Sequence, residues 1–164
     1  MIIVGNILAL LASIFMVITG LIKNKKKIIY IQSIQIFLFI LSNAVLGGIT
    51  GVIINLVSFI RNILCYKDVF NLKVKIFLIS VSIILSLLFN NLGIIGFLPL
   101  ISTVLYTFLM DIKDVIRFKY INIIVTTLWF IYDIFILSFT SAAFDFMCII
   151  ANIITIYKMK KSNI

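Results

Sequence analysis

Long apolar runs with few or no charges dominate this chain and leave few folds open to it. The first run covers residues 2–22, and six more follow at about 29–46, 51–66, 74–90, 94–110, 120–138 and 142–158. A helix needs about 20 mostly apolar residues to cross a bilayer, and each run is close to that length. Hydrophobic residues form 64% of the chain, too many for a soluble core to bury. The sequence therefore predicts an all-α membrane protein with seven transmembrane helices in one integral membrane domain, 1–164.

The basic residues fall only in alternate loops. They cluster at the ends of the first, third, fifth and seventh runs and in the segments that follow, at Lys23 to Lys27, Arg61 to Lys75, Lys113 to Lys119 and Lys158 to Lys161. The intervening loops, 47–50, 90–93 and 138–141, contain no Lys or Arg. Because Lys and Arg are enriched in cytoplasmic loops, this pattern predicts an N-terminus outside and a C-terminus in the cytoplasm. The net charge of +9 is thus explained by topology, and no nucleic-acid partner is expected.

The third and seventh runs share a pattern of polar residues. An Asn, a hydroxyl residue and a base recur at intervals of three: Asn55, Ser58 and Arg61 in one run, Asn152, Thr155 and Lys158 in the other. This spacing places each set along one side of a helix. We therefore expect an internal repeat, with 1–66 and 94–158 as two three-helix units joined by a linker helix, 74–90. An odd linker makes the units parallel, as in one class of secondary transporters whose solute binds between the halves.

The two intramembrane Asn residues admit two interpretations. An amide in the hydrocarbon region is costly without a partner, so Asn55 and Asn152 should face the protein interior. In one interpretation each amide bonds a neighbouring helix and serves packing. In the other, the two amides, accompanied by Ser58 and Thr155, offer donors and acceptors to a small polar solute at mid-depth.

Several short stretches are distinctive beyond their polarity. They are Leu98-Pro99-Leu100 and Ser102-Thr103 in the fifth run, Leu128-Trp129-Phe130-Ile131-Tyr132 in the sixth, and Ile150-Ala151-Asn152-Ile153-Ile154 in the seventh. Together with Asn55 and Arg61, they make the chain resemble the YgjV family of bacterial inner-membrane proteins. That resemblance implies a multi-pass protein of the bacterial inner (cytoplasmic) membrane and implies little about a substrate.

More distantly, the predicted arrangement of three helices, one linker helix and three further helices resembles that of the SWEET and PQ-loop transporters. In those proteins an Asn on each of the third and seventh helices and a Trp on the sixth line a central solute pocket. The likeness implies a pocket formed by Asn55, Asn152 and Trp129. The Pro-Gln dipeptide of PQ-loop proteins is absent, and the sole proline, Pro99, lies in the second unit. Because proline permits a kink in a membrane helix, Pro99 is a hinge candidate for that unit alone.

Two acidic residues fall within predicted membrane helices. Asp145 lies near the start of the seventh helix, where the helix dipole favours an acid and water is within reach. Asp133 lies in the C-terminal half of the sixth helix, where the dipole disfavours an anion. It therefore needs a water-filled vestibule, a hydrogen-bond partner or a proton. A role in proton coupling is the functional hypothesis for Asp133.

The chain lacks the usual parts of catalytic sites. It has no His, no Glu, no glycine-rich phosphate loop and no nucleophile elbow, and its two Cys show no metal-ligand spacing. We expect no enzyme activity, cofactor or metal. The leading hypothesis is a membrane protein that binds or transports a small polar solute between two halves. The alternative is a structural or regulatory membrane protein whose Asn residues serve packing, and the formation of a homo-oligomer is left open.

Overall fold

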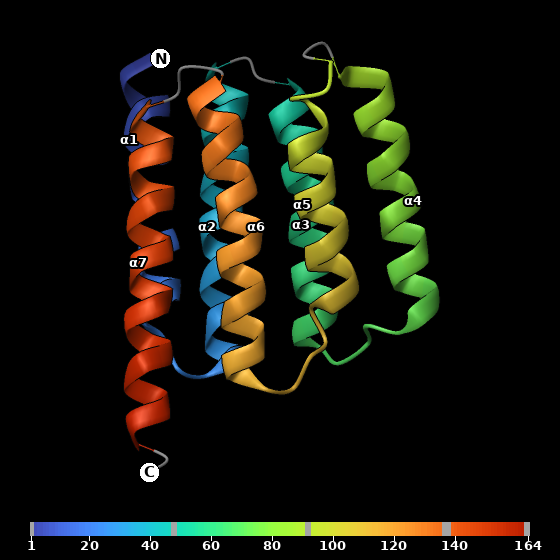
Figure 1. Ribbon diagram of the computed structural model, residues 1–164. Coiled ribbons are helices and arrows are strands. Elements are labelled where there is room, and N and C mark those ends of the chain that lie inside the picture. Colours follow the sequence, from blue (N-terminus) through green and yellow to red (C-terminus); the bar gives the residue numbers. More distant parts are fainter. Residues whose placement is uncertain (1, 47–48, 91–92, 136–138, 163–164) are drawn as a thin grey trace.

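Helices account for nearly all of the chain. The computed structural model describes residues 2–46, 49–90, 93–135 and 139–162. The helices are α1 (Ile2–Leu21), α2 (Lys25–Leu46), α3 (Ile49–Tyr66), α4 (Leu72–Phe89), α5 (Phe97–Leu109), α6 (Val115–Phe135) and α7 (Phe139–Ser162). Consecutive helices run in opposite directions, so the two termini lie at opposite ends of the bundle (Figure 1). The predicted all-α class is confirmed, with seven helices in the described ranges.

The helix starts differ from the predicted ones mainly where a polar residue caps them. Asn24 accepts a hydrogen bond from the backbone N–H of Lys27 at 3.1 Å. Asp114 accepts one from Ile116 N–H at 2.8 Å. Ser, Asp and Asn satisfy the free N–H groups of a first turn in this way. As a result, α2 and α6 begin about one turn before the predicted positions, 29 and 120, and include residues of the basic loops. Parts of the predicted runs and loops, at 47–48, 91–92 and 136–138, lie outside the described residues.

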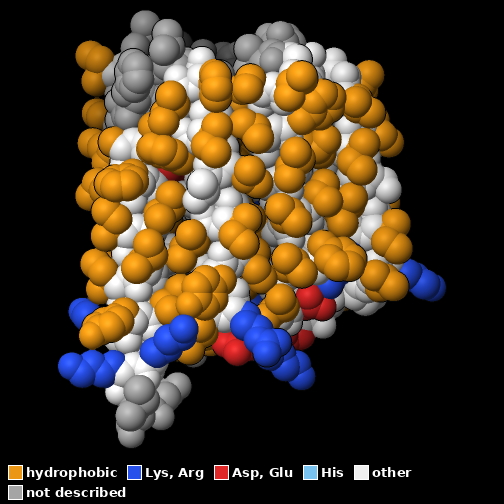
Figure 2. Space-filling model, in the orientation of Figure 1, with side chains coloured by type: hydrophobic (Ala, Val, Ile, Leu, Met, Phe, Trp, Pro, Cys, Tyr) orange, Lys and Arg blue, Asp and Glu red, His pale blue; other side chains and the backbone are white. Residues whose placement is uncertain are grey.

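Five of the helices are long and apolar enough to cross a membrane: α1, α2, α4, α6 and α7. The apolar parts of α3 and α5 are shorter, and the 13 residues of α5 span only about 20 Å at 1.5 Å per residue. Apolar side chains cover the face of the bundle shown in Figure 2, and basic side chains gather at one end. Ile94, Leu88 and Phe77, for example, are 86%, 72% and 65% exposed. Such a surface suits lipid rather than water.

The helices form two layers that close into a ring. One layer holds α1, α2 and α3, the other holds α7, α6 and α5, and α4 lies at the edge beside α3 and α5 (Figure 1). Each helix packs on the next in the chain, and α7 packs against α1. The α1–α7 approach depends on Gly20, because a Cβ there would lie 2.7 Å from the Cβ of Ala151. The predicted division into three, one and three helices and the direction of insertion remain predictions.

The main apolar core lies at one end of this ring. The loops α1–α2, α3–α4 and α5–α6 and the C-terminus lie at the same end (Figure 1), which carries the basic residues and is called the basic end below. Just inside it, both layers contribute to one buried group, here called the basal cluster: Ile28, Ile29, Cys65, Tyr106, Met110, Phe118 and Ile121. The rings of Tyr106 and Phe118 are 5.8 Å apart. The basal cluster therefore joins the two layers at the basic end.

Candidate functional site

A cavity of about 550 Å³ occupies the space between the layers. All seven helices contribute to its wall. Many lining residues carry hydroxyl or amide groups: Ser13, Thr19, Gln32, Gln35, Asn43, Asn55, Ser58, Ser102, Thr103, Asn122 and Thr126. A soluble protein would expose such residues, whereas this chain turns them inward and presents apolar residues outward. We call this space the axial cavity.

The axial cavity follows the length of the bundle. Asn43, Phe89 and Gly96 line it at the end opposite the basic residues. Toward the basic end, its last lining residues include Arg61 and Tyr106. Tyr106 belongs to the basal cluster, in which Ile28, Met110 and Phe118 are 0% exposed. The described residues thus close the cavity toward the basic end.

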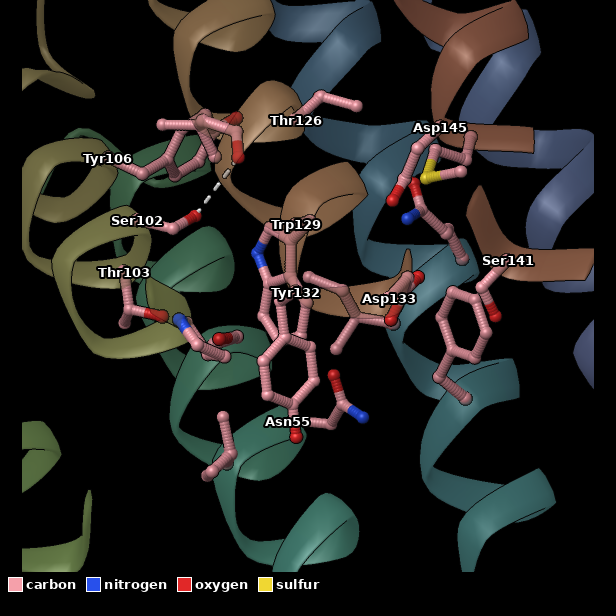
Figure 3. Close-up of a pocket in the computed structure, with 18 of the residues that line it drawn as sticks. Asn55, Ser102, Thr103, Tyr106, Thr126, Trp129, Tyr132, Asp133, Ser141 and Asp145 are labelled. Atoms are coloured by element: carbon pink, nitrogen blue, oxygen red, sulfur yellow. Dashed lines mark hydrogen bonds between the residues drawn. The ribbon is translucent and has the colours of Figure 1, made fainter. Parts of the chain in front are cut away.

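The predicted pocket residues Asn55, Ser58 and Trp129 line the axial cavity. Asn55 and Ser58 come from α3 and Trp129 comes from α6, so opposite layers supply them (Figure 3). The Trp129 ring meets Tyr132 edge-on, with centroids 5.8 Å apart and planes at 89°. The Asn55 side chain has no hydrogen-bond partner among the described residues. An amide and an aromatic face are thus available together at the cavity wall.

Asn152 and Thr155 lie elsewhere, among buried groups between α1, α6 and α7. The Asn152 amide donates to the Cys148 carbonyl at 2.9 Å, and its oxygen accepts from Lys119 Nζ at 3.3 Å. Thr155 Oγ1 donates to the Ala151 carbonyl at 2.8 Å. Neither Asn152 nor Thr155 lines the axial cavity. The contacts of Asn152 are those that the packing interpretation requires.

The two intramembrane acids come together near the end opposite the basic residues. Asp133 and Asp145 both line the axial cavity, and they are 8% and 5% exposed. Their carboxyl groups lie near each other (Figure 3). Asp145 Oδ2 is buried and has no hydrogen-bond donor among the described residues. Asp133 therefore has the cavity that its position in the helix requires, with a second carboxyl group nearby.

Pro99 lies in the first turn of α5 and lines the axial cavity. A proline is tolerated there, because the N–H that it lacks has no partner within the helix. This placement removes the mid-helix kink on which the hinge prediction rested, and a hinge at Pro99 stays a prediction.

The match to a known family covers almost the whole chain. The model of the Imp-YgjV family, which is described as a bacterial inner membrane protein, matches residues 3–163. The chain belongs to the Imp-YgjV family. It is therefore a bacterial inner membrane protein, as the resemblance predicted. No curated protein and no solved structure gives a significant match.

Two basic side chains of this Imp-YgjV protein, Lys119 and Arg61, are buried rather than exposed in the loops. Lys119 is 0% exposed and donates to the Gly20 carbonyl at 2.7 Å. Arg61 is 6% exposed and lines the axial cavity. Both are near helix ends, where the sequence pattern assigns them to the basic loops. The recurrence of Arg61 at a fixed spacing from Asn55 was the one feature that connected it with the cavity.

Metal ligands are not gathered in the described part of this Imp-YgjV protein. There, no group of three or more His, Cys, Asp or Glu side chains is close enough to hold a metal ion. Cys65 and Cys148 are both free and buried, in the basal cluster and at the cavity wall respectively.

Proposed function

We propose that this protein binds a small polar solute in the axial cavity and carries it across the bacterial inner membrane without altering it chemically. The observation that carries the proposal is the 550 Å³ space lined by polar groups from every helix. Pockets for small molecules typically measure about 300–1,000 Å³ and place a few polar groups among apolar and aromatic ones. Inside a membrane protein, such inward polarity is costly and is usually retained for function.

Several lining groups support a polar rather than an apolar solute. Gln35 Oε1 and Asp145 Oδ2 are buried acceptors that lack donors among the described residues. A buried polar atom without a partner costs about 1–3 kcal/mol. A solute that brings hydroxyl or amino groups would satisfy these acceptors, while Trp129 offers it an aromatic face.

Transport would require the basal cluster to open. With the predicted N-out topology, the basic end faces the cytoplasm, so the described conformation has its closed end on that side. A solute entering from the outside would stop above the basal cluster. We expect a second conformation in which the cluster separates and the opposite end closes, as in alternating access between two helical units. The division into units 1–66 and 94–158 belongs to this proposal.

Asp133 gives the proposal a proton-coupled form. Two carboxyl groups near each other in a buried site repel when both are ionised, so the pair of Asp133 and Asp145 would favour the uptake of one proton. In this form, Asp133→Asn abolishes the pH dependence of transport. If transport by the Asp133→Asn protein keeps the pH dependence of the parent, proton coupling through Asp133 is wrong.

The sole tryptophan provides the first test. Purified protein is titrated with sugars, nucleosides, amino acids and vitamins while Trp129 emission and the melting temperature are recorded. A ligand in the axial cavity should change Trp129 emission and raise the melting temperature. Asn55→Ala should weaken both effects. A matched control is Asn152→Ala, which alters an Asn outside the cavity and should leave ligand affinity unchanged in the folded fraction.

The alternative function is a structural or regulatory membrane protein that binds no solute. It is favoured by the contacts of Asn152, which join α7 to Lys119 of α6. Under this alternative, no compound in the library changes Trp129 emission or the melting temperature. Ligands identified in the screen would then be tested for uptake into proteoliposomes, and binding without uptake would refute transport alone.

A further inference from the structure

Arg61 lies at the closed end of the axial cavity with neutral partners only. Its guanidinium donates to Asn62 Oδ1 through Nε and Nη2, both at 3.3 Å, and to Thr107 Oγ1 through Nη1 at 3.4 Å. The guanidinium carbon lies 4.6 Å from the centroid of the Tyr106 ring. These three hydrogen bonds use three of the five N–H groups that an arginine carries. In the described part of the chain, two N–H groups therefore remain for another acceptor.

Within the described ranges, no acidic side chain forms an ion pair with Arg61. The ion pairs among the described residues join Lys26 to Asp68, Lys75 to Asp111 and Arg117 to Asp114. Asp133, one of the cavity's own acids, is distant. Arg61 is five residues from the basic end of α3, at Tyr66, whereas Asp133 is 18 residues from the basic end of α6, at Val115. At 1.5 Å per residue, this difference of about 13 residues separates their levels by roughly 20 Å.

A buried cation in this situation is incomplete without an anion. Removing a charge from water costs several kcal/mol, which neutral hydrogen bonds and one aromatic face repay only in part. Arginine's planar fork also matches the two oxygens of a carboxylate or phosphate. Lys119 is a useful contrast, because it is buried with neutral partners as well but does not line the cavity. Among the basic residues that the structure describes, only Arg61 combines burial, unused donors and access to the cavity.

We propose that the solute carries an oxyanion, a carboxylate or a phosphate, and that Arg61 binds this group at the closed end of the axial cavity. The proposal rests on the proposed function, since it names the class of solute for the same cavity. Gln32, which also lines this end and contacts the Tyr106 hydroxyl, holds that ring beside the guanidinium. The rest of the solute then lies toward Trp129 and Asn55.

Matched pairs of compounds test the charge directly. The probes are lactate with lactamide, glucose phosphate with glucose, and adenosine monophosphate with adenosine, each titrated against the purified full chain by Trp129 emission. We expect the anionic member of at least one pair to bind about tenfold or more tightly than its neutral partner, as charge-assisted hydrogen bonds provide. The phosphate and carboxylate pairs distinguish the two kinds of oxyanion. The preference should persist in roughly 0.5 M salt, because a buried contact is screened little.

Three substitutions separate the effect of Arg61 from that of the overall positive charge. Arg61→Met should remove the preference for the anion, and Arg61→Lys should restore part of it through charge without the fork. Lys119→Met removes a buried cation outside the cavity and should keep the preference. Should Arg61→Met fail to fold, Arg61→Lys and the salt dependence of the parent protein still decide the question.

The outcomes also separate this proposal from the proposed function. If neutral and anionic members bind equally, the oxyanion proposal is overturned and solute binding stands. An anion preference that survives in Arg61→Met, or that disappears at high salt, overturns it as well, because the anion then binds elsewhere. If no member of any pair and no compound in the wider library binds, both proposals fail.

Discussion

The two Asn residues that the sequence treats as equivalents should respond in opposite ways to substitution by Ala. Asn152 is 1% exposed and joins α7 to Lys119 of α6. Asn55 lines the axial cavity and has no hydrogen-bond partner among the described residues. We expect Asn152→Ala to destabilise the fold and leave ligand affinity intact. We expect Asn55→Ala to weaken ligand binding and leave the fold intact.

The contacts set the size of the difference. Asn152→Ala leaves the Lys119 ammonium with the Gly20 carbonyl at 2.7 Å as its one remaining described acceptor. Losing a hydrogen bond to a charged group costs about 1.5–3 kcal/mol, although interhelical bonds in membranes average about 0.6 and reach about 1.7 kcal/mol. The void left by the amide adds to this loss. We therefore expect about 2–3 kcal/mol for Asn152→Ala. Asn55→Ala should cost less than about 1 kcal/mol, because it removes no hydrogen bond between helices.

Equilibrium unfolding in mixed detergent measures these free energies, and a double-mutant cycle with Lys119→Met assigns them. The Asn152 and Lys119 substitutions should show a coupling of about 1–2 kcal/mol, whereas Asn55 and Lys119 should be additive within about 0.5 kcal/mol. Equal destabilisation by the two Asn substitutions would refute the reasoning. So would additivity of Asn152→Ala and Lys119→Met, since the contact between them would then carry no energy.

Three further predictions concern other parts of the fold. Gly20→Ala should destabilise the protein by about 1–3 kcal/mol, because the added Cβ overlaps the side chain of Ala151 on α7. The second substitution Ala151→Gly should recover part of this loss in the same unfolding assay. The ammonium of Lys26, 2.7 Å from Asp68, lowers the pKa of that carboxyl. The resulting stabilisation of the fold is complete above about pH 4, the pKa of Asp in the unfolded chain, and is lost as the pH falls through the lowered pKa. Lys26→Met should therefore raise the pKa of Asp68 measured by NMR. Alkylation of Cys65, in the basal cluster, should accelerate during turnover in a Cys148→Ala background, and an unchanged rate would contradict opening of that cluster.

The helices and their alternation could be predicted from the sequence because each depends on local features. Apolar runs of membrane-crossing length and alternate basic loops predicted all seven helices to within a few residues. The shifts at α2 and α6 arise from capping by Asn24 and Asp114, side chains that the apolar runs do not include. The inward position of Asn55 also followed, since an amide among aliphatic residues identifies the face that turns from lipid. The place of Trp129 in the pocket came from the resemblance to the SWEET and PQ-loop transporters instead, because an aromatic residue can face either lipid or protein.

What each inward face meets could not be predicted from spacing. The interval of three puts Asn152 and Thr155 on one side of α7, but that side packs on α1, where Gly20 allows close approach. The equivalent side of α3 faces the axial cavity. The same limit applies to Arg61 and Lys119, because a basic residue near a helix end can reach water or turn inward. The rotation of the helix within the bundle decides whether such a side chain reaches water or turns inward.

The distribution of charge in the axial cavity links the two proposals. Asp133 and Asp145 lie toward one end, with Tyr132 and Cys148 beside them, and Arg61 lies at the other. An oxyanion entering from the acidic end must pass the carboxyl pair before it reaches Arg61, and two ionised carboxylates would repel it. Proton uptake by the pair removes that repulsion.

At equilibrium an anion held at Arg61 still repels ionised carboxylates across the cavity, by about 0.8 kcal/mol per charge pair at roughly 20 Å and an effective dielectric constant of about 20. Anion binding should therefore be accompanied by partial proton uptake. Because binding and protonation favour each other reciprocally, affinity for the anion should rise as the pH falls, until the anion itself is protonated. Calorimetric titrations in two buffers of different ionisation enthalpy count the protons taken up. Asp133→Asn should reduce this number toward zero while the preference for the anion over its neutral partner remains. If the parent protein takes up no proton on binding, the carboxyl pair and Arg61 act independently.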